Sequence, residues 1–587
     1  MLHRPNYLHF RPTRWHWLAF AMFACLFLAL GIGLRDPWPA DEPRFALNAL
    51  EMLRTGHFWL PHRGGELYPD KPPLYMWATA LAIAATGSVR LGFLLPSLFA
   101  ALGTLALVVD LSRRLYGARI ALLAGAALLT TLQFVLQAKA AQIDMLLTFF
   151  TTLGAYGLFR HALLGDGKRW WYLACIAMGL GILTKGVGFL PLLMLPAWTW
   201  LARRGHAVRL ESKTLLLGLG CLIGTLLLWV VPMILITSLG DDPSLAAYRD
   251  NILLKQTGER YASAWHHLKP WYYYLVEVLP WAWMPLVLTL PWLLPAWWRR
   301  LKRSDARLVL PLFGVIAILV FFSWSPGKRG VYMLPTAPLL VLAMAPMLPG
   351  LLGKAGPNCL GALVLAALGV MFLAAGVLGA LGLPALAELA TQYQVAPWLG
   401  WGLLGCAAIA LLVWLRPRAG LSALALWFVI FWGWWSTDAY LQMNGTRSPR
   451  DMMQSVARQS GPGAWLALPG FDEEFLLQAR QPSVHFGYHT PKEAQLKRAY
   501  AWLQQAPQQR WMLIEQRTTD RLTCLDDTQA IAMGFQNSAH WLLIPGTAFA
   551  ACPGDLHAAP LFIAPTTLPE GWDADGKGDE RQAVSFL

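Results

Sequence analysis

Two kinds of ionisable side chain in this sequence could act together on an anionic ligand. Two carboxylates, Asp41 and Asp144, each stand beside an apolar stretch. Cations also stand beside apolar stretches: Arg44, Lys71, Lys139, Lys185, Arg260, Lys328 and Arg329. Ionisable groups at the edge of a bilayer are costly and often functional. Fixed positive charge around two carboxylates suits group transfer from a lipid-linked phosphate, because the cations stabilise the departing phosphate.

Each of these residues also has an interpretation that involves no chemistry. Asp41 precedes Glu42 and Pro43, a pattern typical of a helix N-cap. Asp144 opens an apolar stretch and could cap a helix in the same way. A single cation at a membrane edge can simply extend its side chain to the lipid headgroups. Both interpretations stay open for each residue at this point.

The composition places these residues in a membrane protein. Of the 587 residues, 56% are hydrophobic and 14% are charged, whereas about a quarter of a typical soluble chain is charged. An ordinary soluble enzyme is therefore excluded. A net charge of +14 would suggest nucleic acid as a partner of a soluble protein, but cytoplasmic loops of membrane proteins collect positive charge. We therefore expect the lipid bilayer, and no nucleic acid, as a partner.

A window of roughly 20 residues predicts about thirteen transmembrane helices. They begin near Trp15, Leu91, Ile120, Asp144, Trp171, Val187, Thr214, Trp271, Leu308, Val331, Leu360, Trp398 and Leu421. The apolar run 72–86 is short for a span and is interpreted as a helix at the membrane interface. If this run crossed the membrane, the densest cationic loops would face outward, against the positive-inside bias. The bias therefore predicts a cytoplasmic N-terminus.

Three segments are then expected outside: a first outer loop at 35–90, a second at 239–270, and a tail at 441–587. In the first loop, polar residues share one helical stripe, with the spacing of Asp41, Arg44, Asn48, Glu51 and Thr55. We expect this helix on the membrane with its polar edge over a cavity. Residues 1–440 should form the transmembrane domain. Short apolar stretches and a helix at 491–505 predict a small α/β domain in the tail.

The tail also holds two cysteines outside the apolar runs. Cys524 and Cys552 could form a disulfide in an oxidising compartment such as the periplasm, or remain two thiols.

Several motifs follow one another along the first 350 residues or so. They are Asp41-Glu42-Pro43-Arg44, Tyr68-Pro69-Asp70-Lys71-Pro72-Pro73, Arg113-Arg114-Leu115-Tyr116-Gly117, Ile143-Asp144, Leu183-Thr184-Lys185-Gly186, Gly258-Glu259-Arg260-Tyr261 and the stretch from Lys328 to Pro335. Together they resemble the GT-C glycosyltransferases of the protein O-mannosyltransferase superfamily, most of all the bacterial aminoarabinose lipid A transferases. The resemblance implies a polytopic helical enzyme of the bacterial inner membrane with periplasmic interfacial helices over its active site. We expect the protein to be a monomer.

The resemblance also implies substrates and residue roles. The donor would be a polyprenyl-phosphate sugar, such as 4-amino-4-deoxy-L-arabinose or a related sugar, and the acceptor lipid A or another periplasmic glycolipid, with inversion at the anomeric carbon. The roles are assigned as follows: catalysis to Asp41 and Asp144; donor-phosphate binding to Lys71, Arg44, Arg260, Lys185 and Lys328; and the cavity wall to Glu42, Tyr68 and Tyr332.

The sequence also departs from the family pattern in two places, and it leaves two alternative functions open. No Asp-x-Asp pair lies near Asp144, and His266 and His267 are adjacent, so no metal site is predicted and a divalent-cation requirement stays open. The alternative enzyme is a protein O-glycosyltransferase with the same type of donor. A lipid flippase or transporter is less favoured, because the charges gather at one membrane face and no internal repeat is evident.

Overall fold

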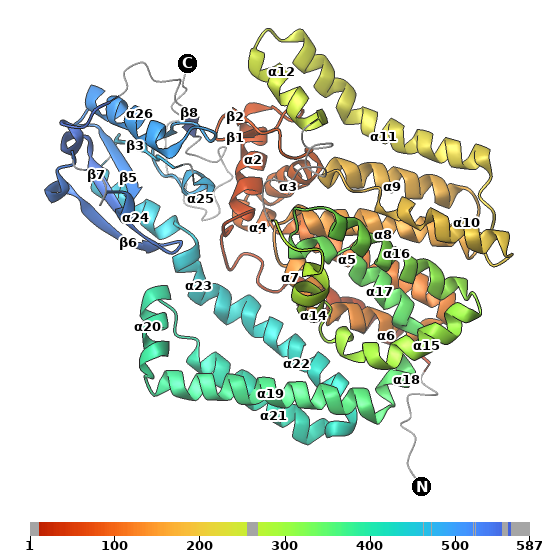
Figure 1. Cartoon of the computed structure of the whole chain (residues 1–587). Helices are drawn as coiled ribbons and strands as arrows, with labels where there is room; N and C mark the ends of the chain where they lie inside the picture. The colour runs from red at the N-terminus through yellow and green to blue at the C-terminus, as the bar shows by residue number, and fades with distance from the viewer. Residues whose placement is uncertain are drawn as a thin grey trace.

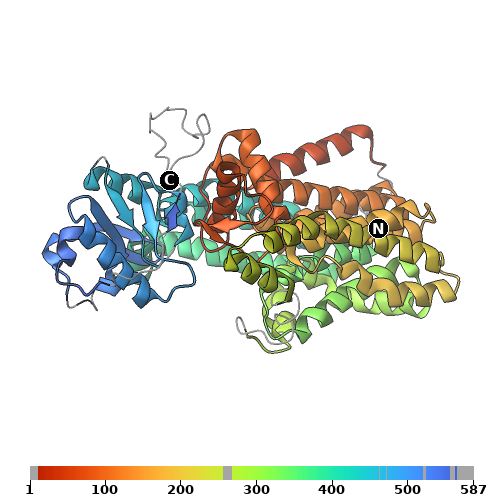
Figure 2. The same cartoon turned by 90° about the horizontal axis from the view of Figure 1, so that it is seen from above.

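The chain consists of a long helical bundle followed by a mixed domain of strands and helices (Figure 1). The computed structural model describes residues 11–254, 268–461, 463–470, 472–519, 522 and 524–554, together with the backbone of 562–564. We call residues 450–564 the tail domain. Figure 2 shows the tail domain at one end of the bundle, and in Figure 1 the turn between α10 and α11 lies at the opposite end.

The first part of the bundle carries the first outer loop and its neighbours. Its elements are α1 (Arg14–Ala29), α2 (Glu42–Thr55), β1 (His62–Arg63), β2 (Glu66–Leu67), α3 (Leu74–Thr86), α4 (Val89–Gly92), α5 (Leu95–Tyr116), α6 (Ala118–Leu129), α7 (Leu132–Ala138), α8 (Ile143–Ala162), α9 (Arg169–Lys185), η2 (Leu190–Met194), α10 (Leu195–Arg203), α11 (Ser212–Leu239) and α12 (Pro243–Asp250).

The second part of the bundle leads to the tail domain. Its elements are η4 (Tyr274–Val278), α14 (Leu279–Ala282), η5 (Leu286–Thr289), α15 (Leu290–Lys302), α16 (Ala306–Trp324), η6 (Gly330–Met333), α17 (Thr336–Met344), η7 (Ala345–Met347), α18 (Leu348–Leu352), α19 (Ala355–Ala380), α20 (Pro384–Tyr393), α21 (Trp398–Leu415), η8 (Pro417–Ala419), α22 (Gly420–Trp434), η9 (Trp435–Ala439) and α23 (Tyr440–Arg447).

Helices occur at all the positions where spans were expected, but not all of them are long and apolar enough to cross a membrane. Within the described residues 7 helices meet that requirement, or up to 9 if each of two bent pairs is one span. The bends are 71° between α6 and α7 and 105° between the helices on either side of 283–285. The number thirteen is therefore not confirmed. Helix α3 has 13 residues, too few for a span, as expected of an interfacial helix.

Antiparallel packing in the bundle brings distant residues to one edge. Helix α8 packs along α9, and α9 along α11. Because α8 begins and α9 ends at the same edge, Asp144 in the first turn of α8 meets Lys185 at the end of α9. Helices α19, α21 and α22 form a separate group with their own apolar core (Figure 1).

The tail domain is built on a mixed sheet in the strand order β6-β7-β5-β3-β4-β8. Strand β3 is parallel to β4 and β5, and the other pairs are antiparallel. Its elements are α24 (Arg450–Ser460), β3 (Trp465–Ala467), α25 (Glu473–Leu477), β4 (Ser483–His485), α26 (Lys492–Gln505), β5 (Arg510–Glu515), α27 (Gln516–Thr519), η10 (Asp527–Gln529), β6 (Ile531–Gln536), β7 (Ala539–Pro545), η11 (Gly546–Phe549) and β8 (Phe562–Ala564).

Alternation along the strands gives this sheet two apolar faces. Leu466 and Leu513 face α24 and α25, whereas Ala467 and Met512, one residue away along the same strands, face α26. Helices therefore cover the sheet on both sides.

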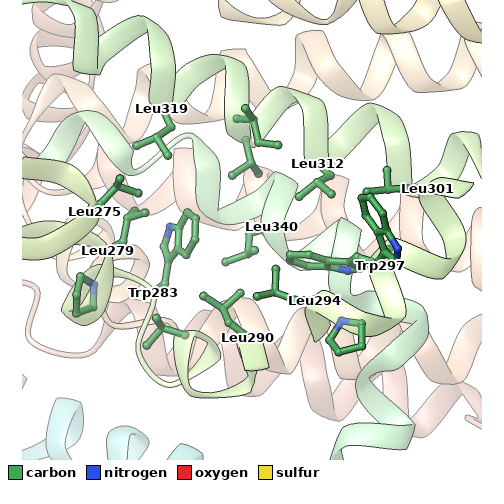
Figure 3. Close-up of a pocket in the computed structure, with 16 residues that line it drawn as sticks. Leu275, Leu279, Trp283, Leu290, Leu294, Trp297, Leu301, Leu312, Leu319 and Leu340 are labelled. Carbon is green, nitrogen blue, oxygen red and sulfur yellow. The ribbon is translucent and has the colours of Figure 1, made fainter. Parts of the chain in front are cut away.

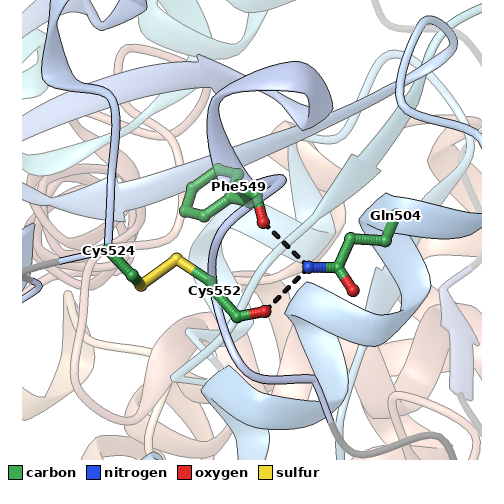
Figure 4. The surroundings of a disulfide bond; sticks show 4 residues. All are labelled: Gln504, Cys524, Phe549 and Cys552. Carbon is green, nitrogen blue, oxygen red and sulfur yellow. Dashed lines mark hydrogen bonds between the residues drawn. A yellow bond between two sulfur atoms is a disulfide. The ribbon is translucent and has the colours of Figure 1, made fainter.

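A disulfide joins Cys524 to Cys552, with their Cα atoms 5.0 Å apart. Gln504 in α26 donates hydrogen bonds of 2.8 Å to the carbonyls of Phe549 and Cys552 beside it (Figure 4). Of the two alternatives for these cysteines, the structure shows the disulfide.

Candidate active site

Asp41 lies at the start of α2 and faces cations from distant parts of the chain. Its carboxylate accepts a 2.8 Å hydrogen bond from Arg329 and one of 3.1 Å from the side chain of Gln142, and it lies 3.6 Å from Arg44. Asp41 occupies the N-cap position of α2, but its side chain makes no capping hydrogen bond. Asp41 is thus the N-cap residue by position, but its carboxylate bonds the side chains around it instead of capping the helix.

The surroundings of Asp41 keep its carboxyl ionised. Burial alone would raise the pKa of this carboxyl. The positive charges of Arg329, Arg44 and Lys185 outweigh burial, so the pKa of the carboxyl lies below its ordinary value. At neutral pH Asp41 can orient or attract a group, but it has no proton to donate.

Asp144 forms a buried ion pair with Lys185. The N-cap residue of α8 is Gln142, and Asp144 lies within the first turn, so the N-cap interpretation of Asp144 is wrong. The amine of Lys185 lies 4.3 Å from the centre of the Tyr332 ring, which suits a cation–π contact. Tyr332 thus borders this pair, in agreement with its predicted place at the wall of the site.

These side chains form one group, which we call the carboxylate–cation cluster. Its members are Asp41, Arg44, Asp144, Lys185 and Arg329. The charges of Asp41 and Asp144 both act on Arg329, which links the two ion pairs. The members come from the start of α2, the start of α8, the end of α9 and the turn before η6. Three cations against two carboxylates leave the cluster with net positive charge, which favours an anionic ligand.

Arg329 joins the cluster in place of its neighbour Lys328, which the sequence had favoured. The amine of Lys328 donates to the carbonyls of Ser325 at 2.6 Å and Lys269 at 3.0 Å. The backbone at Arg329 is extended, so successive side chains point in opposite directions. Both cations are recognisable in the sequence, but the sequence does not show which of the two side chains faces the cluster. Lys139, another cation noted in the sequence, also donates to carbonyls, at the end of α1.

Glu42 serves the local structure of the outer loop. Its carboxylate pairs with Arg35 and accepts hydrogen bonds from the backbone N–H groups of Trp38 at 2.8 Å and Ala141 at 2.9 Å. With these partners and only 6% of the residue exposed, Glu42 anchors the approach to α2 instead of lining an open cavity.

The remaining predicted site residues are Lys71 and Tyr68, which the structure describes, and Arg260, which it does not. The amine of Lys71 is half-buried and donates to the carbonyl of Asp70 at 2.9 Å. Tyr68 is buried, with the guanidinium of Arg63 4.8 Å from its ring centre. Arg260 lies outside the described residues, so its predicted role stays a prediction.

The polar stripe of α2 was expected to face a cavity, but its later part faces a hairpin. Glu51 accepts hydrogen bonds from the backbone N–H groups of Gly64 at 2.7 Å and Gly65 at 3.3 Å, in the turn between β1 and β2. Both glycines have positive φ, as a tight hairpin turn requires. Burial is the main cause that raises the pKa of the Glu51 carboxyl to about 7.

A second feature near the cluster is an apolar groove beside α15 and α16 with a volume of about 750 Å³ (Figure 3). It runs from Leu275 and Leu279 at one end, past Trp283, to Leu301 at the other. Its lining has no titratable side chain, so the groove can hold a hydrocarbon chain but offers no acid or base. Within the described residues, no group of three or more His, Cys, Asp or Glu side chains is placed to hold a metal ion.

Comparisons with known proteins agree with this arrangement. Residues 70–234 match the family model of dolichyl-phosphate-mannose-protein mannosyltransferases. A curated undecaprenyl phosphate-alpha-4-amino-4-deoxy-L-arabinose arabinosyl transferase of Pseudomonas fluorescens is 32% identical over 61% of this chain and 63% of its own length. A Pseudomonas aeruginosa protein of the same description is 30% identical over 54% of this chain and 57% of its length. The matches thus span less than two thirds of these relatives.

Solved structures show the fold over nearly the whole chain. The crystal structure of ArnT from Cupriavidus metallidurans bound to undecaprenyl phosphate has a TM-score of 0.68 at 19% identity, covering 92% of this chain and 100% of that one. Its apo state gives a TM-score of 0.67. The chain therefore has the GT-C fold of ArnT, and the resemblance of its sequence to aminoarabinose transferases is confirmed.

Proposed function

We propose that this chain is a membrane glycosyltransferase that moves a sugar from a polyprenyl-phosphate donor to lipid A or another periplasmic glycolipid. The sugar is 4-amino-4-deoxy-L-arabinose or a related one. The observation that carries the proposal is the carboxylate–cation cluster, in which Asp41 and Asp144 lie among three cations at the edge of the bundle nearest the tail domain. The proposal is also supported by a relative that is named an undecaprenyl phosphate-alpha-4-amino-4-deoxy-L-arabinose arabinosyl transferase, and by the similar ArnT structure that binds undecaprenyl phosphate.

The geometry suggests how the cluster assists the reaction. In an inverting displacement, an acceptor oxygen attacks the anomeric carbon while the bond to the polyprenyl phosphate breaks. Arg44, Lys185 and Arg329 stabilise the negative charge on the departing phosphate. If the acceptor is already an anionic phosphate, no proton has to be removed. The ionised Asp41 then positions the sugar or the acceptor instead of acting as a base.

The same proposal covers the orientation in the membrane. The disulfide between Cys524 and Cys552 supports a tail domain in the oxidising periplasm. The loops rich in arginine and lysine, such as 203–213, then lie in the cytoplasm, in line with the positive-inside bias. The apolar groove would receive the hydrocarbon chain of the donor, because one of its ends, Leu275, directly follows Tyr274, which packs near Arg329.

The test uses membranes supplied with lipid-linked sugar and lipid A, with the product measured by mass spectrometry. Asp41→Asn and Asp144→Asn should each lower transfer by about a hundredfold, the usual effect of losing one group that acts on the reacting centre. Asp250→Asn changes an exposed carboxylate in α12 and should leave transfer unchanged. Wild-type rates in both cluster variants would refute the proposal.

The acceptor has a second candidate. The matching family model is that of protein mannosyltransferases, so transfer to serine or threonine of a periplasmic protein is the alternative. Mass spectra of lipid A and of periplasmic proteins, with and without the gene, separate the two, because only the true acceptor loses the added sugar.

A further inference from the structure

The tail domain is built into the first outer loop. Leu47 on α2 is fully buried and belongs to the same apolar core as Met453 in α24 and Leu476 in α25. Polar contacts extend this interface to the hairpin: the ring of His485 lies 2.6 Å from the carbonyl of Gly64. Helix α2, which positions Asp41, is thus held from two sides, by the bundle and by the tail domain.

One carboxylate of the tail domain reaches the carboxylate–cation cluster. Glu473, at the start of α25, accepts a 2.9 Å hydrogen bond from Nε of Arg44 and one of 3.2 Å from Arg63. The side chains of Glu473 and Arg63 are 11% and 3% exposed, whereas that of Arg44 is 24% exposed. The Nε edge of the Arg44 guanidinium is therefore bonded to Glu473, while about a quarter of the Arg44 side chain stays exposed.

We propose that Glu473 is a positioning residue of the transferase reaction: from the tail domain it fixes the plane of the Arg44 guanidinium so that the other donors of Arg44 face the donor phosphate. This inference rests on the proposed function. The guanidinium is planar, so a bond to Nε on one edge sets the direction of the terminal nitrogens on the other. One of these, Nη1, already lies 3.6 Å from Asp41, in the direction of the cluster.

Glu473 also carries a negative charge, which repels the donor phosphate. The experiment has to separate this repulsion from the positioning of Arg44. Arg63 pairs with the same carboxylate oxygen, so its positive charge already balances the negative charge of Glu473. The positive charge of Arg44 is then in excess. The net charge of this group of three is positive. Positioning should therefore outweigh repulsion, and loss of Glu473 should weaken donor binding.

The test measures KM for undecaprenyl-phosphate sugar and kcat in the full-length protein. Glu473→Ala should raise KM by about tenfold and change kcat by less than about twofold, because a hydrogen bond that prepares a charged group for binding is lost. Glu473→Gln keeps an acceptor oxygen and should restore part of the affinity. The control is Glu66→Gln, which changes another contact between the loop and the tail domain, a 2.7 Å bond from the backbone of Tyr488 that involves neither Glu473 nor Arg44. Its KM should stay within about twofold of wild type.

A double-mutant cycle shows whether Glu473 acts through Arg44. Glu473→Ala should add little to the KM of Arg44→Ala, since the group that it positions is already missing. Additive effects, a lower KM in Glu473→Ala, or an equal rise in Glu66→Gln would each overturn the inference. If the wild-type protein transfers no sugar, the proposed function fails. The affinity of the same variants for undecaprenyl phosphate alone then still tests the positioning role.

Discussion

Replacing Lys185 with methionine should separate the structural and chemical roles of the buried ion pair. The side chains of Lys185 and Asp144 are 10% and 6% exposed. Lys185→Met leaves the Asp144 carboxylate buried without its partner, which should destabilise the protein by about 3–5 kcal/mol. The double variant Lys185→Met, Asp144→Asn removes both charges and keeps similar volumes, so its stability should return to within about 2 kcal/mol of wild type.

The assay follows unfolding in detergent by the fluorescence of the 30 tryptophans and measures sugar transfer in parallel. The matched control is Lys168→Met, which breaks an ion pair with Glu211 whose side chains are 52% and 64% exposed. Exposed ion pairs contribute little to stability, so this control should unfold almost as wild type does. The double variant should be stable but transfer sugar far more slowly than wild type, because the cluster has lost the Lys185 amine and the Asp144 carboxylate while Arg44 and Arg329 remain.

Three results would refute this reasoning. Wild-type stability of Lys185→Met would mean that the pair is not buried as described. A double variant as unstable as Lys185→Met would mean that the loss is due to packing and not to an unpaired charge. Full transfer by a stable double variant would leave the pair a purely structural role.

Three further predictions concern other parts of the molecule. Arg329→Gln should lower kcat/KM by about a hundredfold. It should also move the acidic limb of the pH profile to higher pH, because the pKa of Asp41 rises without its nearest cation. The neighbouring change Lys328→Gln should mainly lower the unfolding temperature. Burial is the main cause that raises the pKa of Glu474 to about 8. The folded state therefore holds the proton of this carboxyl more tightly than the unfolded state does. The folded protein loses stability as the pH rises from about 4.5 to about 8. Glu474→Gln should therefore raise the unfolding temperature relative to wild type increasingly across that window, and an advantage that is constant with pH would contradict this. Leu290→Trp, which narrows the apolar groove, should raise KM for a long polyprenyl donor more than for a short one, as kinetics with two chain lengths would show.

The placement of Asp41 and Asp144 in one cluster follows from features that are visible in a single sequence. Loop charge sets the direction of each helix, and Asp41 and Asp144 both adjoin segments assigned to the outer side. Lys185 ends the helix after Asp144, so antiparallel packing brings it back to the same edge. These relations depend on span length and sign of charge, which are local properties of the chain.

Other parts of the site depend on relations that no local pattern contains. Glu473 stands 429 residues from Arg44, in a domain without a recognisable motif, so nothing in the sequence links the two. The choice of Arg329 over Lys328 depends on the backbone conformation of a single turn. The number of spans is not confirmed either, and a hydropathy window does not detect features such as the 71° break between α6 and α7.

The shared core around Leu47 has a consequence for biogenesis. The ribosome makes α2 among the first residues, but the helices that cover Leu47 are made more than 400 residues later. Until those helices are made and dock, the apolar face of α2 around Leu47 lacks its partners. Completion of the site thus waits for the last quarter of the chain, and chains released before that point should be selectively cleared by quality-control proteases.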